Sequence, residues 1–444
     1  MRARAHEIAA AVGGTLHGRD VEVEGATIDS RVVRGGELFV PVRADRDGHD
    51  FIGAALRAGA NAYLTARGTS DGTAIEVPDT IRALAELARW ARAHLPDQVV
   101  GITGSAGKTS TKDLLATILR RGRVVAASTR SFNNELGVPL TLFNAPGDTE
   151  VTVVEMGARD AGHITHLCDL ARPTIGVVTN VGLAHTARFG SVDDVARAKR
   201  ELPSALPDGG TAVLNADDEL VTAMKTATVA SVLTFGLEGG DVRATDVSLD
   251  RELRPSFRLV TPWGDVDVDL RARGLHQVPN ALAAAAAALT LDTDLGEVAA
   301  GLSDAVVSPW RMELAHTHRG AIVVNDAYNA NPQSTEAALR ALAELDARRH
   351  IAVLGPMLEL GDVSTREHRR IGELARSLGV SLIAVDAPAY GGDDVADIDA
   401  ALARLGELGP GDVVLVKASR AAGFERVAQA LLAEPGEERA WSRS

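Results

Sequence analysis

Residues 99–115 read VVGITGSAGKTSTKDLL. Residues 99–103 form a short β-prone run, and a glycine-rich turn follows them directly. After the turn, apolar residues recur at Leu114, Leu115 and Ile118, a spacing that gives a helix one apolar face. A strand, a glycine turn and a helix in this order direct backbone N–H groups and the positive end of the helix dipole at one point. The stretch therefore predicts a phosphate-binding loop.

The loop supplies the groups that a nucleoside triphosphate needs. Lys108 offers a charge to the β- and γ-phosphates, and the hydroxyl of Thr109 suits a magnesium ion. The loop is one residue shorter than the common G-x-x-x-x-G-K-[ST] form, because Ile102 stands five positions before Gly107. An ordinary glycine turn before a helix is the alternative, and the Lys-Thr pair between strand and helix disfavours it. The predicted ATP-binding residues of the loop are Gly104, Ser105, Ala106, Gly107, Lys108, Thr109 and Ser110.

Polar side chains stand at the ends of two further strand candidates. Glu155 ends the run VTVVE, Asn180 ends IGVVTN, and His185 follows in the next loop. Ligands of open parallel sheets lie beyond the carboxyl ends of the strands, so these three groups are expected near the bound triphosphate. A carboxylate such as Glu155 is a hard oxygen ligand suited to magnesium. Lys199, in the helical segment ARAKREL, has no special role by composition, since a lysine on a helix is normally a solvated charge.

Three stretches of different pattern follow one another along the chain. The first mixes a strand candidate at residues 37–42 with helical spacing at residues 51–58 and 81–93. The second contains the phosphate loop, strands of the buried type and a helix that begins at Asn280. The third alternates strands and helices, which is typical of a parallel sheet with covering helices. The strand candidates of the second and third stretches, after the phosphate loop, are residues 151–154, 175–178, 212–214, 321–324, 351–354, 382–385 and 413–416.

Composition limits the classes of protein to which the chain can belong. At 444 residues it is too long for one core, and a prior of about 150 residues per domain gives two to four domains. The net charge of -14 disfavours a nucleic-acid partner. Cys168 is the only cysteine, so no intramolecular disulfide can form, and a reducing compartment is expected. The apolar run at residues 281–291 is too short to span a bilayer, so we expect a cytoplasmic protein without membrane insertion.

Many motifs, in one order, resemble those of the Mur ligase family, and the match covers essentially the whole chain. DAYNANP at residues 326–332 is the most discriminating, and it is similar to the branch that adds D-alanyl-D-alanine. The DNPR box associated with diaminopimelate addition is absent. The other segments that carry the resemblance are the phosphate loop, SFNNELGVPLTL (131–142), EMGARDAGHI (155–164), TNVGLAHTARFGS (179–191), AKREL (198–202), AVLNADD (212–218) and VLGPMLELG (353–361).

The resemblance implies an α/β architecture of three domains. Residues 1–97 would form a smaller α/β domain that binds the UDP end of the substrate. Residues 98–312 would form the central ATP-binding domain with a mostly parallel sheet, and residues 313–444 a C-terminal Rossmann-like domain. The implied reaction is ATP-dependent ligation of D-alanyl-D-alanine to UDP-N-acetylmuramoyl-tripeptide through an acyl phosphate. Two magnesium ions and a monomeric enzyme are expected.

The resemblance also assigns roles to single residues. In the family the lysine that matches Lys199 is carbamylated, which turns a cation into a metal ligand. The implied metal-binding residues are Thr109, Glu155, His185 and carbamylated Lys199. The implied catalytic residues are Lys108, Lys199, His185 and Arg311, of which Arg311 would reach the γ-phosphate. Asn280 would contact the adenine and Asp326 the ribose, while the implied substrate-binding residues are Ser30, Arg31, Asn133 and Asn134.

Three other classes of function remain open at this stage. Another ligase of the same family would add a different amino acid or glutamate. A P-loop kinase or regulatory ATPase would transfer or hydrolyse phosphate without needing both an acid and an amine. A non-catalytic nucleotide-binding module would be expected to lack Glu155, His185 or Lys199, and all three are present.

Overall fold

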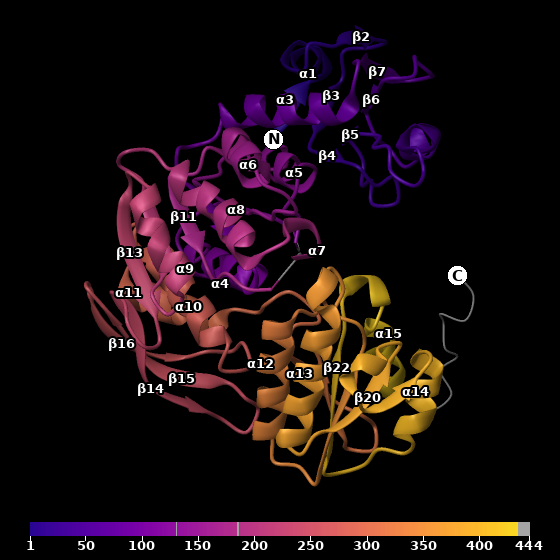
Figure 1. Ribbon diagram of the computed structural model, residues 1–444. Coiled ribbons are helices and arrows are strands. Elements are labelled where there is room, and N and C mark those ends of the chain that lie inside the picture. The colour runs from indigo at the N-terminus through magenta and orange to yellow at the C-terminus, as the bar shows by residue number, and fades with distance from the viewer. Residues whose placement is uncertain (130, 184–185, 434–444) are drawn as a thin grey trace.

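The computed structural model describes residues 1–129, 131–183 and 186–433, and it places them in three parts (Figure 1). The N-terminal part lies at the top of Figure 1, the central part at the left and the C-terminal part at the lower right. Within the described residues the strands form sheets of two, five, nine and six strands. None of the helices in the described ranges combines the length and apolarity that a bilayer crossing needs.

The N-terminal part is built on a small five-stranded sheet. Its strands follow the order β2 (Thr15–His17), β7 (Thr73–Glu76), β6 (Ala62–Thr65), β5 (Leu38–Phe39) and β4 (Ala26–Thr27). The strand expected at residues 37–42 is thus only two residues long. A separate pair joins β1 (Arg2–Arg4) to β3 (Glu22–Glu24), and the helices are α1 (Ala5–Ala11), α2 (Ile52–Arg57) and α3 (Thr80–Arg92).

The central part contains the nine-stranded sheet that carries the phosphate loop. Its strands are β16 (Gly264–Asp269), β15 (Pro255–Thr261), β14 (Val242–Leu249), β13 (Ser231–Gly236), β12 (Thr211–Asn215), β11 (Ile175–Val178), β8 (Val99–Thr103), β10 (Val151–Glu155) and β9 (Val125–Ala127), in spatial order. The neighbours from β9 to β14 pair in parallel, whereas β14, β15 and β16 pair antiparallel. Because β8 lies between β10 and β11, the ends of all three strands meet beside the loop.

Helices α4 (Lys108–Leu119), α10 (Gln277–Leu289) and α11 (Leu295–Asp304) pack together against the central sheet. The alanines of α10, which are all buried, allow the helix backbones to approach closely. The same holds for Gly301 of α11, where an added Cβ would lie 2.5 Å from Ile118 Cα of α4. The other helices of this part are α5 (Gly137–Phe143), α6 (His163–Ala171), α7 (Thr186–Phe189), α8 (Val192–Ser204) and α9 (Glu219–Thr222).

The C-terminal part is a six-stranded sheet covered by helices. Its strands are β17 (Glu313–His316), β18 (Ile322–Asn325), β22 (Asp412–Lys417), β19 (Arg349–Leu354), β20 (Ser381–Val385) and β21 (Asp393–Val395), in spatial order. All neighbours pair in parallel except β17 and β18. Its helices are α12 (Pro332–Glu344), α13 (Ser364–Ser377), α14 (Ile398–Leu405) and α15 (Glu425–Leu432). Together with the central sheet, this confirms the α/β fold class expected from the sequence.

The three parts are joined in different ways. One buried cluster contains side chains of both the N-terminal and the central part, such as Leu84 and Leu142. The amide of Asn144 also accepts from Ala26 N at 2.7 Å and donates to Ala26 O at 2.9 Å, as a neighbouring strand would. Most of the buried residues of the C-terminal part form two other clusters, one of which also includes Leu253 of the central part. The first two parts therefore share a core, and the third is largely independent of it.

The segment after β19 is fixed by His368 of α13. Met357 N donates to His368 Nε2 at 3.0 Å, and His368 Nδ1 lies 2.8 Å from Ser364 O. Since Nε2 accepts, the ring is neutral with its proton on Nδ1. Burial lowers the pKa of His368, an effect that the hydrogen bond to Ser364 partly offsets.

We predict that Gly301→Ala destabilises the protein although alanine is the better helix former. An alanine in a helix normally gains about 1 kcal/mol over glycine. Here the new Cβ would meet the backbone of α4, and overpacking of this kind costs about 1–3 kcal/mol. Denaturant unfolding measures the change. Gly53→Ala in α2 is the matched control, since its nearest neighbour is the flexible end of Arg57 at 3.4 Å, and it should not destabilise. A stabilised Gly301→Ala variant would contradict the packing described.

We predict that His368 makes the C-terminal part sensitive to acid. Its pKa is near 6.5 in the unfolded chain and lower in the folded one, so the unfolded chain binds more protons as the pH falls below 6.5. Stability is therefore lost as the pH decreases through that window. Thermal unfolding between pH 8 and pH 5 should show a smaller loss for His368→Gln than for the unsubstituted protein. The exposed His318 of the same part gives the control variant His318→Gln, which should keep the original slope. Equal slopes in all three proteins would refute the role of His368.

Candidate functional site

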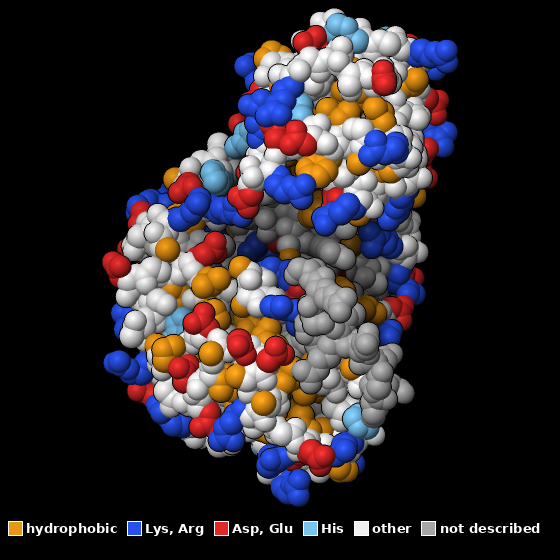
Figure 2. Space-filling view, turned by 90° about the vertical axis from the view of Figure 1, so that its right-hand side faces the viewer, with side chains coloured by type: hydrophobic (Ala, Val, Ile, Leu, Met, Phe, Trp, Pro, Cys, Tyr) orange, Lys and Arg blue, Asp and Glu red, His pale blue; other side chains and the backbone are white. Residues whose placement is uncertain are grey.

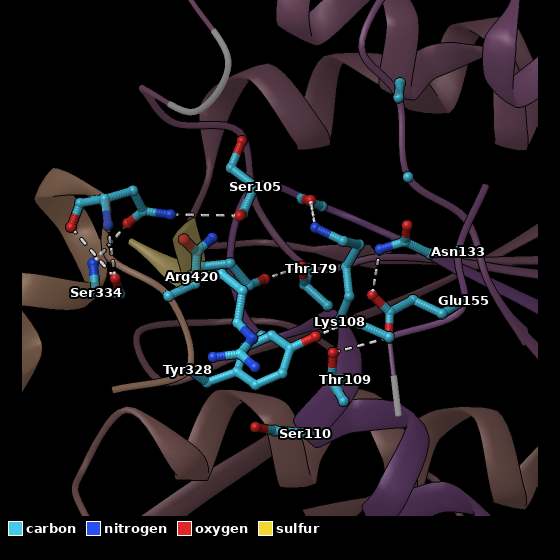
Figure 3. A pocket seen from close by; sticks show the side chains of 18 of the residues that line it. Ser105, Lys108, Thr109, Ser110, Asn133, Glu155, Thr179, Tyr328, Ser334 and Arg420 are labelled. Atoms are coloured by element: carbon cyan, nitrogen blue, oxygen red, sulfur yellow. Dashed lines mark hydrogen bonds between the residues drawn. The ribbon is translucent and has the colours of Figure 1, made fainter. Parts of the chain in front are cut away.

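A cavity of about 1100 Å³ lies where the three parts meet. It is lined by Ile28 of the N-terminal part, by the phosphate loop, and by residues of the C-terminal part such as Tyr328 and Ser334. Figure 2 shows the surface hollowed between the N-terminal part, at the top, and the C-terminal part below, with Lys and Arg side chains along the rim. Figure 3 shows the inner residues, which converge on Lys108 from several elements.

Two glycines of the phosphate loop are required by close neighbours. A Cβ on Gly104 would lie 1.8 Å from Thr179 Oγ1, and a Cβ on Gly107 would lie 2.2 Å from Asn280 Oδ1. Gly107 also has φ +82°, in the left-handed region that favours glycine, directly before α4 begins at Lys108. The loop therefore packs closely between the end of β11 and the start of α10, and a side chain at Gly104 or Gly107 would clash with one of them.

The residues after β11 hold the loop in shape. Ala106 N donates to Asn180 Oδ1 at 2.9 Å, and Asn180 Nδ2 donates to Ala106 O at 3.1 Å. Thr179 Oγ1 donates to the same carbonyl at 2.6 Å. Ser105 Oγ donates to Gly182 O at 3.1 Å. Asn180, expected from the sequence to lie near the triphosphate, thus shapes the loop and also lines the cavity.

Lys108 extends along the loop and points into the cavity (Figure 3). Its Nζ donates to Gly104 O at 2.6 Å. Burial lowers the pKa of Lys108, the charge of Glu155 raises it, and the charge of Arg311 lowers it. An anion placed beside this ammonium would replace the solvation that burial removes, so the position suits phosphate oxygens.

Glu155 is buried at the end of β10 and connects two predicted site residues. Its Oε2 accepts from Thr109 Oγ1 at 2.8 Å, and its Oε1 accepts from Asn133 Nδ2 at 2.8 Å (Figure 3). Thr109 and Glu155 together offer hard oxygen atoms beside the phosphate loop, which are the atoms that magnesium prefers. Among the described residues no group of three or more His, Cys, Asp or Glu side chains is arranged to hold a metal. This donor set fits magnesium, which commonly takes one or two carboxylates together with substrate phosphates and waters.

Lys199 of α8 is buried and lines the same cavity. Burial lowers its pKa well below the usual 10.5, and the charge of Lys108 lowers it further. Within the described part of the chain Lys199 has no hydrogen bond or ion pair. A lowered pKa increases the share of a lysine side chain that is in the neutral, nucleophilic amine form. His185, expected beside it, lies outside the described residues.

The remaining predicted nucleotide contacts border the cavity at the junction with the C-terminal part. Asn280 Nδ2 donates to Gln277 Oε1 at 2.9 Å, and its Oδ1 faces Gly107. Asp326 accepts from Lys417 Nζ at 2.5 Å and from Met312 N at 3.2 Å, so both of its oxygens have protein partners. Arg311 lies against the ring of Tyr328, with 4.3 Å between the guanidinium carbon and the ring centroid.

The predicted substrate-binding residues do not all reach this cavity. Asn133 and Asn134 line it, and Asn134 Oδ1 also accepts from Gly137 N at 3.0 Å at the start of α5. Ser30 and Arg31 follow β4 and are not among the lining residues. The Arg31 side chain is 86% exposed and pairs with Asp29 at 2.7 Å.

Several residues of the cavity were not assigned a role from the sequence. Tyr328 stands within the motif DAYNANP, where only Asp326 was singled out. His276 is half-buried and lines the cavity, and loss of solvation lowers its pKa to about 4, so its ring is neutral. Lys417 is the last residue of β22, and its position at the carboxyl end of a parallel strand is the signal that could have identified it.

The chain is similar to known proteins over nearly its whole length. A family model described as the Mur ligase middle domain matches residues 102–288, and one described as the Mur ligase glutamate ligase domain matches residues 310–420. The UDP-N-acetylmuramoyl-tripeptide--D-alanyl-D-alanine ligase of Mycobacterium bovis is 43% identical, and the match covers 91% of each chain.

Solved structures agree with this relationship. A crystal structure of MurF from Acinetobacter baumannii matches with a TM-score of 0.88 and 29% identity, covering 97% of this chain and 99% of that one. A MurF ligase from Thermotoga maritima, solved in complex with ADP, matches with a TM-score of 0.79 and 30% identity, covering 92% of this chain and 97% of that one. With the family models and the relatives in agreement, this chain belongs to the Mur ligase family.

Proposed function

We propose that this chain ligates D-alanyl-D-alanine to UDP-N-acetylmuramoyl-tripeptide with ATP, giving the pentapeptide precursor of peptidoglycan, ADP and phosphate. The observation that carries the proposal is one cavity lined by the phosphate loop, by Glu155 with Asn133, and by Arg311. An acid, a triphosphate and an amine can meet only in a site of this breadth. The names of the relatives support the choice of substrates.

Each of the three parts would have its own role in binding the substrates. Residues 1–97 would bind the UDP end of the substrate, and residues 98–312 would bind ATP. Residues 313–444 would close over the site, and of these the last eleven lie outside the described residues. The cavity lining includes Ile28 of the N-terminal part and Asn280 of the central part, which supports this assignment. Ser30 and Arg31 remain candidates for contact with the UDP group at the outer end.

The chemistry begins with the terminal carboxylate of the tripeptide, which is a poor electrophile because oxide is a poor leaving group. A carboxylate oxygen attacks the γ-phosphorus, the bond to the β–γ bridging oxygen breaks, and ADP leaves. Lys108 and Arg311 stabilise the negative charge of the transferring group. The amine of D-alanyl-D-alanine then attacks the acyl carbon and gives up a proton, and the tetrahedral intermediate collapses to amide and phosphate. Positioning supplies much of the acceleration.

Thr109, Glu155, His185 and a carbamylated Lys199 would hold magnesium, which would supply charge neutralisation at the phosphates when bound. The environment of Lys199 supports the carbamate. Carbon dioxide reacts with a neutral amine, and burial beside Lys108 favours that form. The product is an anion, which would offset the charge of Lys108 in place of a second buried cation. Asn280, Asp326 and the loop residues 104–110 would bind the nucleotide.

We predict that ADP release requires both UDP-N-acetylmuramoyl-tripeptide and D-alanyl-D-alanine. A coupled ADP assay with each substrate omitted in turn tests this. ADP release with the tripeptide alone, at the full rate, would indicate an ATPase or kinase instead. Replacing the dipeptide by single amino acids distinguishes this activity from that of other ligases of the family, since those ligases would release ADP with a single amino acid.

Lys108→Ala should reduce kcat by at least about 1,000-fold, since it removes a charge that acts on the transferring phosphoryl group. Lys225→Ala is the matched control, because Lys225 is exposed and is not among the residues that line the cavity, and the rate of this variant should stay unchanged. Near-normal turnover of Lys108→Ala would refute the phosphate-loop assignment.

Lys199→Ala should be inactive and should regain part of its activity with short carboxylic acids such as acetate or formate. These acids can occupy the space left by the side chain and restore a carboxylate there. Short primary amines of the same size are the control and should not restore activity. Full activity of Lys199→Ala without any added acid would exclude the carbamate.

A further inference from the structure

Tyr328 connects segments that lie far apart in the sequence. It follows β18 in the C-terminal part, and its hydroxyl forms a hydrogen bond with Ser131 Oγ of the central part. Its ring packs on the guanidinium of Arg311, and its backbone N donates to Trp310 O at 3.2 Å. The side chain is half-buried and lines the cavity. One residue thus touches both the segment that carries Arg311 and the loop before α5.

Arg311 depends on such support because no carboxylate holds it. Among the described residues it forms no ion pair, and its Nε is buried without a hydrogen-bond partner. The residues on either side have positive φ, 62° at Trp310 and 52° at Met312, which is uncommon for side chains of this size. Met312 N is fixed by Asp326 Oδ1, which in turn shares its carboxylate with Lys417. A strained turn and one aromatic face therefore position an uncompensated positive charge.

Ser131 links Tyr328 to the other side of the site. The same loop continues to Asn133, whose amide donates to Glu155 at 2.8 Å. Glu155 accepts from Thr109 of the phosphate loop. A chain of contacts therefore runs from Arg311 through Tyr328, Ser131 and the loop to Glu155. This chain of contacts therefore joins Arg311 to Glu155, the two groups that would act on the terminal phosphate.

We propose that Tyr328 is a positioning residue for phosphoryl transfer: its ring orients Arg311, and its hydroxyl ties that arginine to the loop that holds Glu155. This inference rests on the proposed ligase function. The ring leaves the guanidinium N–H groups free for phosphate oxygens, which a carboxylate partner would occupy. The hydroxyl bond spans the junction between the central and C-terminal parts, so it forms only when these parts are together.

The test separates the ring from the hydroxyl. Tyr328→Leu removes both, and kcat should fall about fiftyfold, about tenfold for one partly desolvated cation–π contact and about fivefold for the hydrogen bond, with little change in KM for ATP. Tyr328→Phe keeps the ring, and kcat should fall only about fivefold, the effect of one neutral hydrogen bond. Ser131→Ala should match Tyr328→Phe, and the double variant should be no slower than either single one.

A second double-mutant cycle, of Tyr328 with Arg311, tests whether the ring acts through Arg311. If it does, Tyr328→Leu should have almost no further effect on kcat in an Arg311→Ala background. Independent, multiplicative effects of the two substitutions would overturn the proposal. So would a Tyr328→Leu variant that turns over at the unsubstituted rate. A purely structural role would instead lower the thermal midpoint and leave the two effects independent.

A readout that does not need ligation keeps this inference separate from the proposed function. Hydrogen exchange of the backbone amides at residues 131–137 should be faster in Tyr328→Phe and in Ser131→Ala than in the unsubstituted protein. Faster exchange together with no ligation by the unsubstituted protein would refute the proposed function and leave the contact between Tyr328 and Ser131 standing. Unchanged exchange in both variants would refute the contact itself.

Discussion

The concentration of positive charge at the phosphate loop is the constraint on which the rest of the site depends. Lys199 is buried and Lys108 is half-buried in the same cavity, and loss of solvation lowers the pKa of both amines. Arg311 adds a guanidinium that has no ion pair within the described residues. Buried cations are costly unless an anion compensates them. The protein accepts this cost at a place where a triphosphate would supply the missing negative charge.

The contacts between the three parts are consistent with a site that opens to admit the triphosphate. The N-terminal and central parts share buried residues and the paired amide of Asn144, so they form a stable base. The C-terminal part has a core that is mostly its own, and it meets the base through an apolar contact at Leu253 and through hydrogen bonds such as Ala187 N to Glu359 O at 3.0 Å. A part whose core is mostly separate can move relative to the base as a unit. That property suits a site in which an acyl phosphate must be protected from water.

The accuracy of the strand predictions followed the burial of the strands. Residues 99–103, 151–154 and 175–178 were expected from continuous apolar runs, and β8, β10 and β11 lie there, because strands buried on both faces carry that pattern. The antiparallel strands β14 to β16 were not expected. Their residues alternate with exposed polar side chains and charges, so they lack the continuous apolar signal. At residues 37–42 the predicted strand was too long, since only the two residues of β5 form it; a short apolar run need not form a full strand.

The sequence alone determined the phosphate loop, because its glycines, its lysine and the elements around it are adjacent in the chain and act locally. It also determined the family, through motifs whose residues are read without knowing where they fold. Only the tertiary structure decided that Glu155 is shared between Thr109 and Asn133, that Asp326 is paired with Lys417, and that Arg311 lies on Tyr328. These contacts join residues far apart in sequence, and their partners are set by sheet order and domain packing rather than by any local pattern.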